Sequence, residues 1–419
     1  MLKKRILVIS WFYPPVNSSE GLVTYKLLKA SKYEYDVFCQ KGNASWSYGN
    51  KEKLPETQNV NSIYAKTKDL NEWIEEAVEY FNENKDKYDI VMTRSMPPES
   101  HMIGLRLKKI KPEITWIASF GDPIAENPYV KLTISYPSPH SRANCKSFKG
   151  IISPKRIIRN GMFKIRYRKQ QKSILEKDLN LQNNVFKNSD YIIFNSEYQK
   201  NYMFRNCKQE IKDKGIVLNH SFDKELYPKT VEKNEKIKMT YVGHLDYLRT
   251  PHLLLEAISE LKEEDENLAD KICFEFYGNM GNEDKVLIID DELTDIVKVK
   301  KPVSYLESLK IMKQSDWVFL IDANLTEVSD KNIFFAAKLA DYMGSGSNIF
   351  GITMLDGISA DILRNLNMIL TSYSKEEIKN YLWLILNNNY TVKANEEYRK
   401  EFDSTEVAKR FDELISKIN

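Results

Sequence analysis

Short apolar segments alternate with helix-forming segments along this chain, and this alternation constrains its fold more than any other feature. In the first half the apolar segments are residues 5–10, 35–38, 63–65, 88–92, 114–120 and 191–194. In the second half they are residues 238–242, 273–277, 297–299, 317–321, 349–352 and 368–370. Strands that alternate with helices at short spacing are typical of a doubly wound parallel sheet. We therefore predict an α/β protein with two Rossmann-like halves.

The length of the chain also favours two domains. A chain of 419 residues is too long for one ordinary hydrophobic core. The polar run 229–236 is the best candidate for a linker, so we predict an N-terminal domain over 1–228 and a C-terminal domain over 229–400. Residues 401–419 are predicted to form a C-terminal helix that packs back on the N-terminal domain.

Cysteine spacing and hydropathy predict a cytoplasmic protein. The four cysteines are scattered, without the paired spacing of a zinc site, and are expected to be reduced thiols. The apolar run near the N-terminus meets Pro14 and Pro15 instead of a cleavage site, so it is interpreted as a strand and not a signal peptide. No apolar segment approaches the roughly 20 residues that span a bilayer.

Positive charge is concentrated in one segment. Twelve Lys and Arg lie between residues 131 and 172, and no Asp or Glu lies between residues 127 and 175. Because the whole chain carries a net charge of only +3, the rest is net acidic. Basic residues interleaved with apolar and aromatic ones suit an anionic membrane surface. The alternative is a basic loop without a specific partner, and no nucleic-acid partner is expected.

The segment 334–346 predicts a helix that leads to a buried strand. Helix-forming residues continue to Met343, and Gly344 and Gly346 provide the stop. Lys338 and Asp341 are three residues apart and therefore share one face of this helix. A cation and a carboxylate on one face can hold a diphosphate and a ribose diol, respectively. The alternative is a solvated ion pair between the two side chains.

Three further positions lie where α/β sheets bind ligands. The loop before Gly21 joins the first strand to a helix, and glycine there lets backbone approach an anion. Asp122 directly follows a strand, although an Asp-Pro pair is also an ordinary turn. Arg249 precedes the first helix of the second half, where its guanidinium group and the helix dipole both favour phosphate. No metal-binding or Walker A pattern is present, so neither a metal nor a cofactor is expected.

Several segments resemble glycosyltransferases of family 4, the glycosyl transferases group 1. Residues 11–15 (WFYPP) resemble the opening strand and loop of that family, and residues 95–101 and 116–123 (WIASFGDP) resemble a subset with "pWiaDFrDPw". Residues 241–249 (YVGHLDYLR) resemble "fvGrl…K", and residues 337–346 (AKLADYMGSG) are similar to "sKlfeYla.G.P". The resemblance covers nearly the whole chain and implies the GT-B fold, in which two Rossmann-like domains face each other across a cleft.

The resemblance implies roles for individual residues. Lys338 and Arg249 would bind the donor diphosphate and, with Asp122, form the catalytic set. The other donor-binding residues would be Gly21, Gly243, His244 and Asp341, with Asp341 on the ribose hydroxyls.

The sequence also departs from the family in three places. The first acid of the E-x7-E pattern would fall on Ile333, and Glu327 or Asp330 is a possible substitute. The family's double glycine is Glu20-Gly21 here, and His244 replaces a common arginine.

The function implied is transfer of a sugar from a nucleotide-diphosphate sugar, with retention of configuration. The acceptor would be a saccharide or a lipid-linked saccharide in envelope or capsule polysaccharide synthesis, reached from the cytoplasm or from the inner face of the plasma membrane. Two alternatives remain open: a nucleotide-sugar epimerase of the same fold, and a catalytically silent partner subunit.

Overall fold

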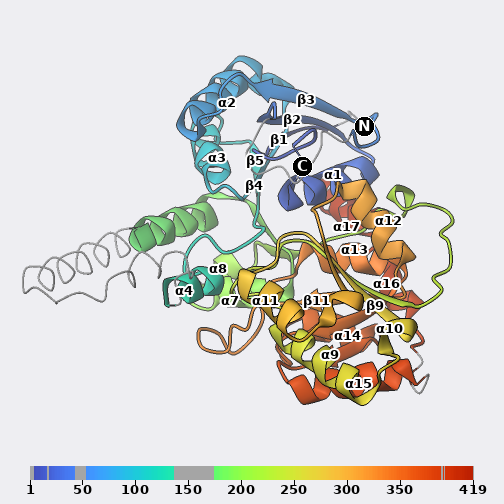
Figure 1. Ribbon diagram of the computed structural model, residues 1–419. Helices are drawn as coiled ribbons and strands as arrows, with labels where there is room; N and C mark the ends of the chain where they lie inside the picture. The colour runs from blue at the N-terminus through green and yellow to red at the C-terminus, as the bar shows by residue number, and fades with distance from the viewer. Residues whose placement is uncertain are drawn as a thin grey trace, which may run out of the picture.

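The structure is a computed structural model that describes residues 4–16, 18–42, 53–135, 174–387, 390 and 392–418. It contains two sheets with helices on their faces, and Figure 1 shows the blue N-terminal elements above the yellow-to-red C-terminal ones. All recorded strand pairs in both sheets are parallel. The predicted α/β class with two Rossmann-like domains is therefore confirmed.

The first sheet has seven strands in the order β3-β2-β1-β4-β5-β6-β7. Its strands are β1 (Arg5–Ile9), β2 (Glu34–Gln40), β3 (Val60–Ala65), β4 (Ile90–Arg94), β5 (Thr115–Ser119), β6 (Tyr191–Phe194) and β7 (Gly215–Val217). The accompanying helices are α1 (Ser19–Ala30), α2 (Leu70–Asn84), α3 (Glu99–Ile110), α4 (Pro128–Ser135), a helix over 174–188, α7 (Glu197–Phe204) and α8 (Gln209–Lys212). The strand order reverses between β1 and β4, so loops from both sides meet there.

The second sheet has six strands in the order β10-β9-β8-β11-β12-β13. Its strands are β8 (Ile237–Val242), β9 (Ile272–Tyr277), β10 (Val297–Lys300), β11 (Trp317–Ile321), β12 (Asn348–Ile352) and β13 (Ile369–Thr371). Its helices are α9 (His252–Glu264), α10 (Leu268–Lys271), α11 (Asn282–Asp290), α12 (Tyr305–Gln314), α13 (Ala337–Ser345), α14 (Ile358–Asn365) and α15 (Lys375–Leu386). Here the order reverses between β8 and β11, which places the loops after these strands side by side.

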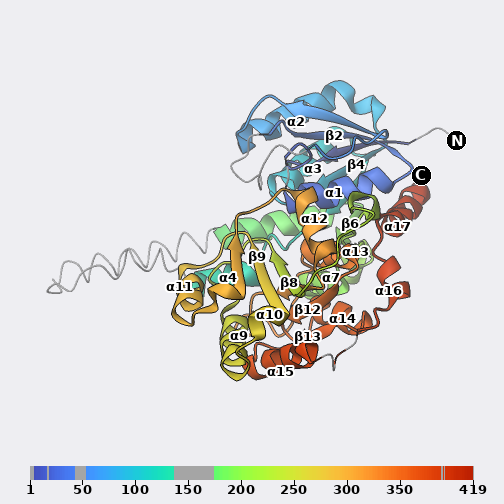
Figure 2. The same ribbon diagram turned by 45° about the vertical axis from the view of Figure 1, so that its right-hand side comes forward.

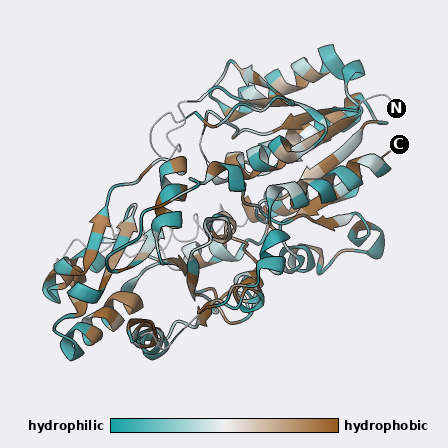
Figure 3. Ribbon diagram, turned by 90° about the vertical axis from the view of Figure 1, so that its right-hand side faces the viewer, coloured by the Kyte–Doolittle hydropathy of each residue, from teal (hydrophilic) through white to brown (hydrophobic). Residues whose placement is uncertain are grey.

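Burial on both faces explains why the central strands are apolar without interruption. The residues 6–9 of β1 and 317–321 of β11 are all buried, as expected for parallel strands between two helix layers. In Figure 3 brown strands lie inside the molecule, and teal segments lie on the outward faces of many helices. The N-terminus of α1 is capped by Ser18, whose Oγ accepts a hydrogen bond from the Gly21 amide at 3.1 Å.

The predicted helix at 334–343 begins three residues later than expected. Ala336 is extended, with φ −61° and ψ 124°, so α13 starts at Ala337. The helix ends at Ser345, and Gly346 then takes a left-handed conformation with φ 80°. The predicted stop at Gly346 is therefore correct, because a left-handed residue after a helix favours glycine, whereas Gly344 lies within the helix.

The two domains share an apolar core, and the last helix of the chain packs on the N-terminal domain. One buried cluster runs from Leu28 of α1 through Phe222, between β7 and β8, to Leu339 of α13. The last helices are α16 (Glu396–Lys400) and α17 (Ser404–Lys417), and α17 lies against α1. The Lys32 amide donates to Asp412 at 3.0 Å, so the C-terminal helix packs on the N-terminal domain. Figure 2 shows both chain ends on this side of the molecule.

Most of the basic segment 131–172 lies outside the described residues, which stop at 135 and resume at 174. Its membrane role therefore stays a prediction. In the described part of the chain, no helix is both long and apolar enough to cross a bilayer.

Candidate functional site

Two cations of the C-terminal domain converge on one tyrosine ring. Lys338, in the first turn of α13, donates a hydrogen bond from its Nζ to the Tyr241 hydroxyl at 2.6 Å. The same ammonium group lies 4.2 Å from the centroid of the Tyr241 ring. Arg249, in the loop between β8 and α9, also interacts with the Tyr241 hydroxyl group. The structure therefore brings together the two residues that were predicted from the sequence to bind the donor diphosphate.

The positive charge of Arg249 acts on that of Lys338. Burial and, second, the neighbouring Arg249 lower the pKa of Lys338 to about 7. Burial also opposes the charge of Arg249, but Tyr241 and Asp322 outweigh it, so the pKa of this guanidinium group is raised. The Nε of Arg249 is buried and has no hydrogen-bond partner. Such a pair is electrostatically suited to an anion that neutralises both groups.

Two carboxylates flank the cations and are held by neighbouring groups. Asp322 directly follows β11, and its Oδ2 accepts hydrogen bonds from Asn332 at 3.0 Å and Thr353 at 2.9 Å. Asp246 accepts a hydrogen bond from the hydroxyl of Tyr129, a residue of α4 in the other domain, at 2.8 Å. These bonds fix the carboxylates, so they orient the cations and leave them free to bind a further anion.

Gly243 leaves room for the Lys338 ammonium group. A Cβ atom at this position would lie only 2.8 Å from Nζ of Lys338, and the φ of 134° is one that favours glycine. His244, which follows, is exposed, and its carbonyl oxygen accepts a hydrogen bond from Tyr241 at 3.1 Å. Both residues therefore lie beside the cation pair, as the donor-binding prediction requires, and their contact with a donor stays a prediction.

The N-terminal domain contributes Asp122 to the same place. Burial and the nearby Glu20 raise the pKa of Asp122 to about 7, while Arg249 of the other domain opposes this shift. Asp122 therefore lies close enough to Arg249, across the interdomain boundary, for the two charges to act on each other. Gly21 lies one residue beyond Glu20, and its amide is already used by the Ser18 cap.

Asp341 lies in different surroundings from Lys338. Its Oδ1 pairs with Nζ of Lys26 from α1 at 2.8 Å and accepts a hydrogen bond from Tyr305 at 3.0 Å. Lys26 and Asp341 are 1% and 7% exposed, so the pair is buried between the domains. The alternative of a solvated ion pair between Lys338 and Asp341 is therefore wrong. In this conformation the carboxylate predicted for the ribose is engaged by Lys26.

The position of the missing family acid is apolar and buried. Ile333 is 2% exposed, and the neighbouring Asn332 binds Asp322 instead. Glu327 and Asp330 are exposed in the loop before α13. The substitution of either for the missing acid stays a prediction.

Several residues of this site were not singled out from the sequence. Tyr241 and Asp322 lie at the carboxyl ends of neighbouring strands, which is the one signal that would have pointed to them. Glu20 and Arg94 were also missed. They form an ion pair of 2.8 Å between α1 and the end of β4, although the residues are far apart in the sequence.

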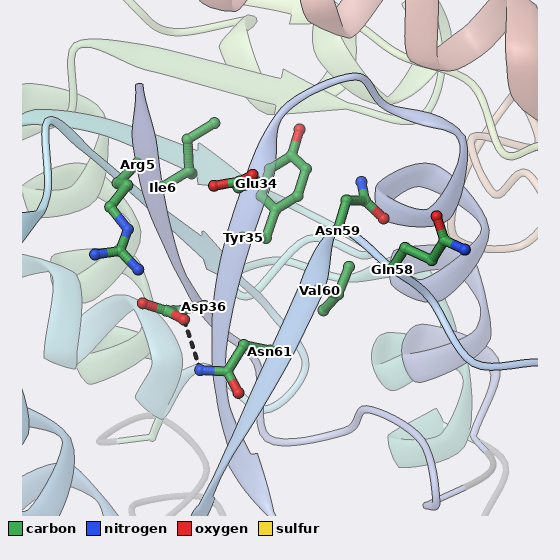
Figure 4. A pocket seen from close by; sticks show the side chains of 9 residues that line it. All are labelled: Arg5, Ile6, Glu34, Tyr35, Asp36, Gln58, Asn59, Val60 and Asn61. Carbon is green, nitrogen blue, oxygen red and sulfur yellow. Dashed lines mark hydrogen bonds between the residues drawn. The ribbon is translucent and has the colours of Figure 1, made fainter. Parts of the chain in front are cut away.

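A pocket of about 150 Å³ lies at the opposite edge of the N-terminal sheet. Figure 4 shows its lining residues at the amino ends of the first three strands, among them Arg5, Glu34 and Asn59. Ligands of doubly wound sheets bind beyond the carboxyl ends. This pocket is therefore separate from the interdomain site.

A substitution at Gly278 would test how closely the loop after β9 packs on the loop after β8, which carries Gly243. A Cβ atom at Gly278 would collide with the Gly243 carbonyl oxygen, and the φ of 142° disfavours any side chain. We expect Gly278→Ala to lower the free energy of unfolding by at least about 1–3 kcal/mol, measured by urea denaturation. Gly281→Ala is the matched control because Gly281 has a φ of −58° and meets only the end of a flexible side chain. Equal stability of the two variants would contradict this packing.

In the described part of the chain, no group of three or more His, Cys, Asp or Glu side chains is arranged to hold a metal ion.

Comparison with protein-family models and with curated proteins finds no match. Solved structures do match over nearly the whole chain. A sucrose-phosphate synthase from Thermosynechococcus elongatus has a TM-score of 0.67 at 13% identity and covers 99% of both chains. A glycosyltransferase from Rickettsia africae has a TM-score of 0.60 at 14% identity and covers 100% of this chain and 99% of its own.

A putative UDP-N-acetylglucosamine 2-epimerase from Listeria monocytogenes has a TM-score of 0.56 at 13% identity and covers 99% of this chain and 96% of its own. The neighbours therefore include both transferases and epimerases. At identities this low, the structural matches establish the fold of this chain and leave its reaction open. Together with the two parallel sheets, they show that this chain has the GT-B fold of glycosyltransferases and related enzymes.

Proposed function

We propose that this protein is a glycosyltransferase that moves a sugar from a nucleotide-diphosphate sugar to a saccharide or lipid-linked acceptor. One observation carries the proposal: Lys338 and Arg249 converge on Tyr241, while Asp122 of the opposite domain lies within electrostatic reach of Arg249. A diphosphate at the cations would place its sugar toward Asp122. We also propose retention of configuration, which follows from the family resemblance and which the anomer of the product would test.

The chemistry of this arrangement favours departure of a nucleoside diphosphate. When the bond between the sugar and the diphosphate breaks, negative charge builds up on the departing oxygen. Fixed cations in a water-poor site stabilise that charge and need no reorganisation during the reaction. Lys338 and Arg249 would supply this stabilisation, so we expect turnover to persist in the presence of EDTA and without an added cofactor.

The acceptor proposal depends on charge. The basic segment 131–172 continues directly from α4, whose Tyr129 contacts Asp246 beside the cation pair. A segment with this charge, joined to α4 in the sequence, would favour an anionic, lipid-linked acceptor at the inner face of the membrane, as in envelope or capsule polysaccharide synthesis. Flotation with anionic liposomes tests the membrane contact, and a charge-neutralised segment that floats equally well would contradict it.

An epimerase is the second candidate because Glu20 and Asp122 lie together near the site. Epimerisation needs groups that move protons at the sugar, and two adjacent carboxyl groups can do so. Thermal shift with a panel of nucleotide sugars, beginning with UDP-sugars, would identify the donor through its stabilisation of the folded state. Product analysis then separates transfer from epimerisation. Absence of either product with every stabilising donor would support a silent partner subunit.

Diphosphate binding at Lys338 is expected to take up a proton. The pKa of Lys338 is lowered to about 7 by burial and Arg249, so above that pH most of the protein lacks this charge. A bound diphosphate favours the ammonium form, so UDP affinity should fall as the pH rises through 7 and beyond. Calorimetry with UDP at about pH 8, in buffers of different ionisation enthalpy, measures this uptake.

Lys338→Arg provides the control for proton uptake. Arginine remains charged at all these pH values, so its binding heat should not depend on the buffer. Equal heats for the wild type in both buffers would show that the ammonium group does not contact the diphosphate.

A further inference from the structure

Two carboxyl groups from different elements meet in the N-terminal domain beside the interdomain boundary. Gly121 follows β5, and a Cβ atom built on it would collide with the carboxylate of Glu20 from α1. The side chain of Glu20 therefore fills the space that Gly121 leaves free. Asp122 is the next residue, so Glu20 lies against the backbone that carries Asp122, close enough for its charge to act on the Asp122 carboxyl group.

Arg94 fixes Glu20 in this position. One terminal nitrogen of its guanidinium group donates to Oε2 of Glu20 at 2.8 Å, and the other donates to Oγ of Ser119 at 2.7 Å. Arg94 is only 6% exposed. Because Ser119 anchors the other terminal nitrogen, the buried guanidinium group holds the Glu20 carboxylate with little freedom.

The loop that carries Asp122 is also held firmly. The Gly121 carbonyl oxygen accepts hydrogen bonds from Asn195 at 2.7 Å and from Gln199 at 2.9 Å. The Gly121 amide donates to Ser95 at 3.2 Å. Residues of the N-terminal domain thus fix both the Glu20 carboxylate and the backbone that carries Asp122.

The charges that face Asp122 come from both domains. Glu20 of α1 acts against its ionisation, and Arg249 of the β8–α9 loop favours it. Arg94 lies behind Glu20 and is occupied by it. Burial and Glu20 together outweigh Arg249, so the pKa of Asp122 is raised to about 7.

We propose that Glu20, held by Arg94, is a positioning residue that sets the charge and the orientation of Asp122 toward the acceptor hydroxyl group. This inference rests on the proposed transfer reaction and adds to it a residue that the family resemblance does not supply, because that family has glycine at this position. When ionised, Asp122 accepts a hydrogen bond from the acceptor hydroxyl and orients its oxygen toward the donor sugar. When protonated, it cannot accept that bond in the same way.

The Asp122 carboxyl group can be titrated without any substrate. In protein labelled with ¹³C at the aspartate carboxyl carbons, the Asp122 signal is identified by its loss in Asp122→Asn. We expect its midpoint near 7 in the wild type and at a clearly lower pH in Glu20→Gln, since glutamine removes the negative charge. An unchanged midpoint in Glu20→Gln would overturn the proposal.

Two further variants serve as controls for this titration. Glu20→Asp keeps the charge but withdraws it by one methylene, so its midpoint should lie between those of the wild type and Glu20→Gln. Glu75→Gln is the matched control because Glu75 also pairs with an arginine, Arg106, but is exposed on α2. A shift of the Asp122 midpoint in Glu75→Gln would show that the effect is not local and would overturn the assignment to Glu20.

The pH dependence of activity separates a positioning role of Glu20 from a merely structural one, because a structural role would not shift the pH profile. Once a donor and an acceptor are known, the acidic limb of the kcat/KM profile should shift to lower pH in Glu20→Gln, by the same amount as the titration midpoint. A limb that does not move while the midpoint moves would overturn the positioning role. If the wild type transfers no sugar, the proposed function fails, whereas the titration still decides whether Glu20 controls Asp122.

Discussion

Lys338→Met is expected to lower the turnover of the donor by roughly 10²- to 10³-fold, the usual effect of removing one fixed group that stabilises a developing negative charge. Methionine keeps the length and apolar contacts of the lysine stem and removes only the ammonium group beside Tyr241. Because that charge matters most when the diphosphate departs, kcat should fall more than KM rises. Steady-state rates of nucleoside diphosphate release measure both.

Stability separates loss of function from loss of fold in this variant. Burial lowers the pKa of Lys338, which means that the folded protein holds the charged form at a cost. Lys338→Met should therefore unfold at a urea concentration equal to or above that of the wild type.

Lys331→Met is the matched control because Lys331 lies in the loop before α13 but is half-exposed and pairs with Asp356 at 3.2 Å. Comparable rate losses in Lys331→Met and Lys338→Met would remove Lys338 from its proposed role.

The sequence predicts the central strands well because burial on both faces leaves an uninterrupted apolar run. Strands β1 and β11 lie at the centres of their sheets and were placed almost to the residue. The edge strand β3 begins at Val60, whereas the sequence predicted it from residue 63. The prediction missed its first residues because Asn61 and Ser62 are polar and interrupt the apolar pattern. An edge strand exposes one side to solvent, so its apolar pattern is weaker.

Sequence reasoning located part of the candidate site through topology. Asp122 and Arg249 each follow a strand, and Lys338 begins the helix after another, so the fold brings them to one interdomain boundary. Contacts between distant residues had no such signal. The Glu20–Arg94 pair joins residues 74 apart and the Lys26–Asp341 pair joins residues 315 apart, and nothing in either local segment specifies its partner.

The contact between Lys26 and Asp341 also bears on how a donor would enter. Asp341 is the carboxylate predicted for the ribose, yet Lys26 of the opposite domain and Tyr305 of α12 hold its Oδ1. The Tyr227 hydroxyl, from the segment between β7 and β8, donates to the Asp341 carbonyl oxygen at 2.7 Å. A ribose can bind this carboxylate only if the domains separate or Lys26 withdraws. The pair therefore ties the stability of the domain contact to the availability of Asp341.

Lys26→Met is accordingly expected to destabilise the protein by about 3–5 kcal/mol, because it leaves a buried carboxylate without its cation. Urea unfolding followed by tryptophan fluorescence measures the change. The double variant Lys26→Met/Asp341→Asn should recover most of this loss, since it removes the orphaned charge and keeps an oxygen for Tyr305.

Lys310→Met is the control for Lys26→Met, because Lys310 of α12 forms an exposed pair with Glu307 at 3.7 Å and should cost no more than about 1 kcal/mol. If Lys26→Met cost as little as this control, the pair would not hold the domains together. Lys26 could then withdraw from Asp341 at little cost, so this contact would not hinder a donor from reaching the carboxylate.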